Sequence, residues 1–172
     1  MKYFTVFLLL FSASFFSNAE PTKSKRSAYA LHKMEAVGVK HYKRGNYRRA
    51  YQKLINAAHQ GMKQAQYFMG FMYLKGQHVE QSAVLGTVWL GLAKESQIKE
   101  WVITYDNVYA VLSKEQKGEV DKKLLEYIDK YGMEAQDVKC EKRRNSIRAR
   151  NKDSIICQKI EFDKVQQYDI GH

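Results

Sequence analysis

Apolar residues recur every three or four positions over residues 28–131. This spacing places them along one face of an α-helix, so it predicts six amphipathic helices in succession. The first of these carries Leu31 and Met34, and the only proline of the chain, Pro21, precedes it. Because proline is the strongest breaker of helices, its position favours an all-α body.

Glycines and cap residues divide the periodic region into separate helices. The glycines predicted to end helices are Gly45, Gly61, Gly76 and Gly132. We expect Gly132 to adopt the left-handed conformation that commonly follows a last helical turn. Ser82 is the predicted N-cap of the fourth helix, and Ser113 with Gln116 has the spacing of a capping box. The helices should therefore form hairpins joined by short loops.

The pattern changes in residues 133–172, where β-branched residues such as Val138 and Ile160 flank a strongly charged stretch. The only two cysteines, Cys140 and Cys157, lie in this stretch. A metal pair or a redox site is the alternative, but neither cysteine has a C-x-x-C neighbour or a nearby histidine. We predict one disulfide that closes a basic loop or a small hairpin.

The amino end has the features of a secretory signal peptide. Lys2 precedes an apolar run over residues 4–16, and Ser17 and Ala19 place small residues at a cleavage point after Ala19. The run is shorter than the 20 or so residues of a membrane span. We therefore predict a signal peptide over residues 1–19, a flexible leader over 20–27, and a soluble periplasmic or secreted protein.

The chain is strongly basic, with 29 Lys and Arg against 18 Asp and Glu. For an exported protein this charge favours acidic proteins or an anionic envelope surface as partners, with nucleic acid excluded by location. The candidate partner-binding residues are Lys40, Lys43, Arg44, Arg48, Arg49, Lys53, Arg143, Arg144 and Arg148. A solvated face that only maintains solubility is an equally good interpretation of these clusters.

Two segments contain similar motifs of small and aromatic residues. The first has Gly38, Gly45, Tyr47, Ala50 and Ala57, and the second has Ala65, Gly70, Tyr73, Gly76, Trp89 and Ala93. The first segment resembles the tetratricopeptide repeat, and the second resembles the related Sel1-like repeat, whose inter-helix loop is longer. Gly86 departs from the pattern, because it stands where an alanine is expected opposite Ala50.

The resemblance implies a short α-solenoid of helical hairpins over residues 28–132. In this family such a body presents a concave groove to a protein or peptide, and many exported members are adaptors in envelope complexes. Solenoid repeats contact only their neighbours, which leaves a long curved face for a partner.

No catalytic motif, metal-ligand spacing or cofactor fingerprint is found in the sequence. We predict that Trp89 and Trp101 are core residues, and that Tyr42, Tyr51 and Tyr67 could line a groove. The leading hypothesis is a non-enzymatic interaction scaffold in the bacterial cell envelope, without cofactor or metal. The alternatives are a binder of anionic envelope polymer or lipid and, less favoured, a hydrolase whose site is assembled across helices.

Overall fold

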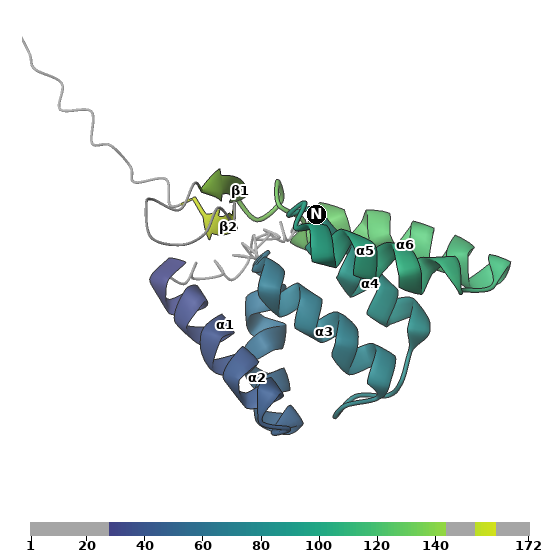
Figure 1. Ribbon diagram of the computed structural model, residues 1–172, viewed down its shortest axis with the longest axis horizontal. Coiled ribbons are helices and arrows are strands. Elements are labelled where there is room, and N and C mark those ends of the chain that lie inside the picture. The colour runs from purple at the N-terminus through teal and green to yellow at the C-terminus, as the bar shows by residue number, and fades with distance from the viewer. Residues whose placement is uncertain (1–27, 144–153, 161–172) are drawn as a thin grey trace, which may run out of the picture.

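The computed structural model describes residues 28–143 and 154–160, and six helices and two strands lie in these ranges (Figure 1). The predicted signal peptide and leader lie outside them. The elements are α1 (Ala28–Lys43), α2 (Tyr47–Ala58), α3 (Lys63–Lys75), α4 (Ala83–Lys94), α5 (Lys99–Ala110), α6 (Lys114–Tyr131), β1 (Val138–Arg143) and β2 (Ser154–Lys159). The six predicted helices are confirmed.

Most of the predicted cap residues end or begin the helices as expected. The Ser82 side chain accepts a hydrogen bond from the Leu85 backbone N–H, and Ser113 with Gln116 forms a complete capping box. Gly76 ends α3 with φ 64°, in the left-handed region. Gly132 was expected to do the same for α6, and this is wrong, because its φ is −68° and its ψ is 174°. A Cβ there would lie 2.5 Å from the Ile128 carbonyl oxygen, so glycine permits a close approach at this position.

Glycines also let the hairpin helices pack closely. A Cβ at Gly38 would lie 2.7 Å from the Leu54 side chain, so α1 and α2 meet at this pair. The α3–α4 hairpin has the same kind of contact between Gly70 and Leu90. A Cβ at Gly86 would lie 2.6 Å from the Leu74 side chain and 3.0 Å from the Gly70 carbonyl oxygen, which shows why Gly86 replaces the expected alanine.

The main core lies between α1, α2, α3 and α4, and α6 covers part of it. The motif residues Ala50, Ala57, Ala65, Trp89 and Ala93 are all at most 2% exposed. Helix α4 is central, since nine of its twelve residues are buried and it packs against α3, α5 and α6. The remaining motif residues with side chains, Tyr47 and Tyr73, are partly buried against this core.

The carboxyl segment forms an antiparallel hairpin in which Cys140 pairs with Cys157. The predicted disulfide between them is confirmed. Val138 is buried, and its side chain would lie 2.9 Å from a Cβ at Gly61, so the hairpin packs on the turn between α2 and α3. Lys159 Nζ donates to the Gln60 carbonyl oxygen at 3.4 Å in the same turn.

None of the helices in the described ranges is long and apolar enough to span a membrane.

Candidate interaction surface

The tip of the α1–α2 hairpin carries a dense group of cations that we call the basic hairpin. Its members are Lys40, Lys43, Arg44, Arg48, Arg49 and Lys53, and all six are exposed. None of them forms an ion pair within the described residues. The only acid in residues 28–58 is Glu35, and it is buried. The structure therefore brings together six candidate residues without neutralising them.

Two of these arginines occupy an electrostatically unfavourable place. Arg48 and Arg49 lie in the first turn of α2, where no acidic residue is present and the Asn46 side chain makes no cap hydrogen bond. The amino end of a helix carries partial positive charge, so anions are favoured there and cations are not. Local rules of this kind are broken most often at functional sites.

An open cavity of about 620 Å³ lies beside this turn. It is lined by Gly45, Asn46, Tyr47, Arg48 and Arg49 from the hairpin and by His78 from the loop after α3. The His78 ring lies 5.6 Å from that of Tyr51. Tyr51 thus packs toward this end of the molecule.

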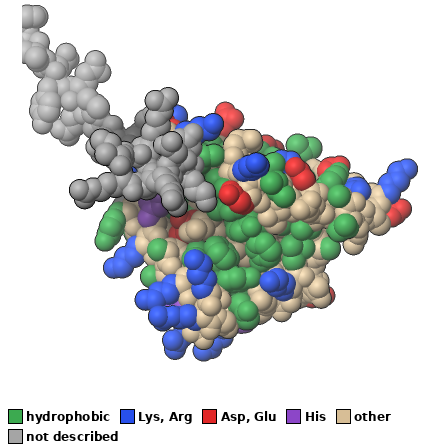
Figure 2. Space-filling view, viewed as in Figure 1, with side chains coloured by type: hydrophobic (Ala, Val, Ile, Leu, Met, Phe, Trp, Pro, Cys, Tyr) green, Lys and Arg blue, Asp and Glu red, His purple; other side chains and the backbone are tan. Residues whose placement is uncertain are grey.

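Aromatic rings extend from the basic hairpin across α3 to α5, and we call them the aromatic strip. Tyr42 of α1 lies 4.8 Å from Phe68, and Phe68 lies 5.9 Å from Tyr67, measured between ring centroids. Tyr67 then stacks on Trp101 of α5 at 4.8 Å and meets Phe71 edge-on at 5.0 Å. Figure 2 shows hydrophobic side chains gathered between α3 and α5, with Lys and Arg over the α1–α2 tip beside them.

The far end of the strip is not part of the protein interior. All five rings are partly exposed, and Tyr67, Phe71 and Trp101 belong to neither of the two clusters of buried apolar residues. The prediction that Trp101 is a core residue is therefore wrong, whereas that for Trp89, which is 2% exposed, is confirmed. Helical periodicity places an apolar residue on a face, but it does not show whether another element covers that face.

The carboxyl-terminal cations lie apart from this surface in the chain and on a different element. Arg143 is exposed at the end of β1, and Arg144 and Arg148 lie outside the described residues. Lys139 of the same strand pairs with Glu141 at 2.8 Å.

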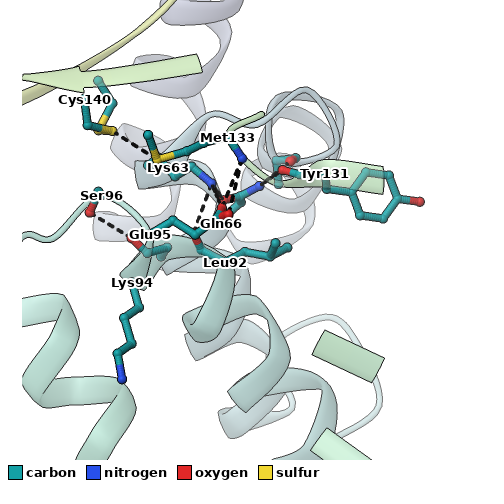
Figure 3. Close-up of polar contacts among 12 residues, drawn as sticks. Lys63, Gln66, Leu92, Lys94, Glu95, Ser96, Tyr131, Met133 and Cys140 are labelled. Atoms are coloured by element: carbon teal, nitrogen blue, oxygen red, sulfur yellow. Dashed lines mark hydrogen bonds and ion pairs between the residues drawn. A yellow bond between two sulfur atoms is a disulfide. The ribbon is translucent and has the colours of Figure 1, made fainter. Parts of the chain in front are cut away.

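A second group of charged and polar residues is centred on the first turn of α3, where the buried Lys63 forms three hydrogen bonds (Figure 3). Lys63 Nζ donates to Gln66 Oε1, to the Leu92 carbonyl oxygen and to Glu95 Oε2, which uses all of its donors. The Lys63 side chain is 1% exposed. Burial lowers the pKa of Lys63, and the nearby Glu95 carboxylate opposes that change. All three proton donors of Lys63 are therefore used within the fold, which suits a structural role.

The same turn joins the ends of several helices. Gln66 Nε2 donates to the carbonyl oxygens of Ala58 and Tyr131, the last residues of α2 and α6. Glu95 accepts from the Met133 backbone N–H, and Glu35 of α1 accepts from that of Ala65 at 2.8 Å. Carbonyl and N–H groups at helix ends lack intrahelical partners, and these side chains provide the missing hydrogen bonds.

Sequence reasoning missed this buried group. Lys63 and Glu95 are 32 residues apart, and no local pattern links them. Within the described residues, no group of three or more His, Cys, Asp or Glu side chains could hold a metal ion.

Comparisons with known proteins find no match to this chain among family models, curated proteins or solved structures.

Proposed function

We propose that this protein is a non-enzymatic interaction scaffold of the bacterial cell envelope that binds an acidic protein or peptide through the basic hairpin. The observation that carries the proposal is the set of six exposed cations, none of which has an ion-pair partner in the described part of the chain. Like charges held together in this way repel one another, and an acidic partner relieves that repulsion.

Three further features support the proposal. The placement of Arg48 and Arg49 against the helix dipole has a cost in stability that a binding role explains. The paired helices resemble Sel1-like and tetratricopeptide repeats, which in turn suggests an α-solenoid. The disulfide agrees with an oxidising compartment, in line with the signal peptide predicted from residues 1–19.

The direct test is affinity capture from an envelope extract of a bacterium that makes the protein. The bait is the mature chain, with or without the double substitution Arg48→Glu and Arg49→Glu. We expect one acidic protein to be recovered in stoichiometric amount by the parent chain. The charge-reversed variant should recover at least about tenfold less, because it replaces attraction by repulsion in the contact.

A matched control separates this surface from net charge. Lys122→Glu with Lys130→Glu makes the same change in charge on exposed positions of α6. The proposal requires this control to retain recovery. Equal losses in the two variants would show that only net charge matters, which is the behaviour of a binder of anionic polymer or lipid, and unchanged recovery in both would remove the basic hairpin from the contact.

A further inference from the structure

We infer that the segment bound by the basic hairpin is amphipathic, with acidic residues over α1 and α2 and aromatic or aliphatic side chains over the aromatic strip. This inference rests on the proposed function and adds the chemistry of the partner. It follows from the continuation of the cations of α1 and α2 into the partly exposed rings of α3 and α5.

The continuity is shown by the ring contacts. Tyr47 lines the cavity together with Arg48 and Arg49, and its ring lies 5.5 Å from that of Tyr42, the first ring of the strip. Its contact with Phe68 carries the surface from α1 to α3, and the Tyr67–Trp101 stack carries it to α5. A chain segment that lies across these helices therefore meets cations first and rings afterwards.

The rings are held in fixed positions before any partner arrives. The Tyr67 hydroxyl lies 3.2 Å from Thr104 Oγ1, which fixes the Tyr67 ring against α5. Lys75 Nζ lies 5.5 Å from the Phe71 ring centroid, so a cation borders the strip at this end also. Rigid aromatic side chains lose little conformational entropy on binding, and they are the side chains that dominate contact energies.

Charge complementarity selects this occupant over a purely apolar one. An uncharged hydrophobic segment would cover the rings but would leave the six cations of the basic hairpin unpaired. A purely acidic segment would pair with the cations but leave the rings in water. Only a segment with both properties uses the whole surface.

Two synthetic peptides test the inference. The first has about four Asp residues, a Gly-Ser spacer and the block Phe-Leu-Phe, and the second replaces that block by Ser-Ser-Ser; each is also made in the reverse order. The chain has two Trp, so Trp89→Phe leaves Trp101 as the only indole reporter. If the Trp89→Phe variant does not fold, the fluorescence of the parent protein is measured instead. The signal of the Trp101→Phe variant is then subtracted as background.

We expect the mixed peptide, in one of its two orders, to bind at least about tenfold more tightly than the Ser-substituted peptide and to reduce quenching of Trp101 by acrylamide. Phe71→Ser should abolish that tenfold advantage and leave binding of the Ser-substituted peptide unchanged. Val111→Ser is the matched control, because Val111 is an apolar residue that is 83% exposed elsewhere on the surface.

The outcomes separate the two proposals. Equal affinity for both peptides, with Trp101 quenching unchanged, overturns the inference and leaves the proposed function standing. If neither peptide binds at about 1 mM, both are overturned. Binding to vesicles that contain phosphatidylglycerol, without binding to either peptide, overturns both in favour of an anionic membrane surface.

Discussion

The charges at the first turn of α3 and those of the basic hairpin belong to neighbouring elements, yet they are arranged in opposite ways. Lys63 and Glu95 are paired and bonded to the ends of other helices. Arg48 and Arg49 are exposed and have no ion-pair partner among the described residues. Buried charge is tolerated only when its partners are complete, so the first group should determine stability. The second group should contribute little to stability and is therefore available for binding.

The largest expected effect is that of Lys63→Met. The substitution keeps most of the side-chain volume but removes the donor from Glu95, from Gln66 and from the Leu92 carbonyl oxygen. Breaking one side of a buried pair leaves unpaired polar groups, and we expect a loss of about 3 kcal/mol in the free energy of unfolding. Urea unfolding followed by circular dichroism measures it.

Lys94→Met is the matched control for that experiment. Lys94 pairs with Asp106 at 2.7 Å, but the two side chains are 34% and 56% exposed. Lys94 also lies over the Tyr105 ring. An exposed pair of this kind is worth at most about 1 kcal/mol. Equal losses at Lys63 and Lys94 would contradict the distinction between buried and exposed charge.

The next effect is that of Gln66→Leu, which removes one amide that serves two helix ends and also accepts a hydrogen bond from Lys63 Nζ. The Ala58 carbonyl oxygen keeps a bond from the Gly61 N–H, whereas that of Tyr131 loses the donor that Gln66 supplies. We expect a loss of about 2 kcal/mol, since a buried carbonyl without a partner costs about 1–3 kcal/mol. In Gln81→Leu, water replaces an exposed bond to the Leu74 carbonyl oxygen, so the same measurement should change by less than about 0.5 kcal/mol. A loss at Gln81 as large as that at Gln66 would refute the argument.

The basic hairpin and the buried group around Lys63 differ in how far the sequence could predict them. The six helices, the Ser82 cap and the Ser113 capping box were predictable because each depends on residues within one turn of the chain. The disulfide was predictable because the chain has only two cysteines. The exposed cations of the basic hairpin were also predictable, since polar positions between apolar stripes face solvent.

Long-range contacts were not predictable. The bonds from the first turn of α3 to Glu35 and Glu95 span about 30 residues, and nothing local marks those acids as buried. Trp101 was assigned to the core because it shares the spacing of buried residues. Its exposure depends on how α5 lies against α3 and α4, which is a property of the packed helices and not of either segment alone.

A smaller effect, visible only through pH, is expected for Glu35. Burial raises the pKa of this carboxyl group from 4.5 to about 6, despite hydrogen bonds from backbone N–H groups of α3 that lower it. Between these values the folded state binds more protons than the unfolded state, so the contribution of Glu35 to stability is present below pH 4.5 and is lost as the pH rises to about 6. The change is at most about 2 kcal/mol.

Glu35→Gln should remove this part of the pH dependence, because glutamine does not titrate but still offers an oxygen to the Ala65 N–H. Unfolding free energies of both proteins, measured at intervals from pH 4 to 7, give the comparison. His32 faces Glu35, with 3.9 Å between Nδ1 and Oε2, so His32→Gln in both backgrounds shows how much of the profile the histidine contributes. Parallel profiles for parent and Glu35→Gln would contradict the assignment to Glu35.

The smallest effect is also the sharpest test of the comparison, because it should change sign between two exposed cations of the basic hairpin. Arg49→Glu places an anion in the first turn of α2, where the helix dipole favours it, and should raise the unfolding free energy by about 0.5 kcal/mol. Lys43→Glu makes the same change in charge in the last turn of α1, where cations are favoured, and should lower it by a similar amount. Both effects should shrink in about 1 M salt. If both variants also lose binding of the proposed acidic partner, binding and stability are separated, since Arg49→Glu then binds less while its fold is more stable. Two shifts of the same sign would show that repulsion among the six cations, and not the helix dipole, controls the energy of this tip.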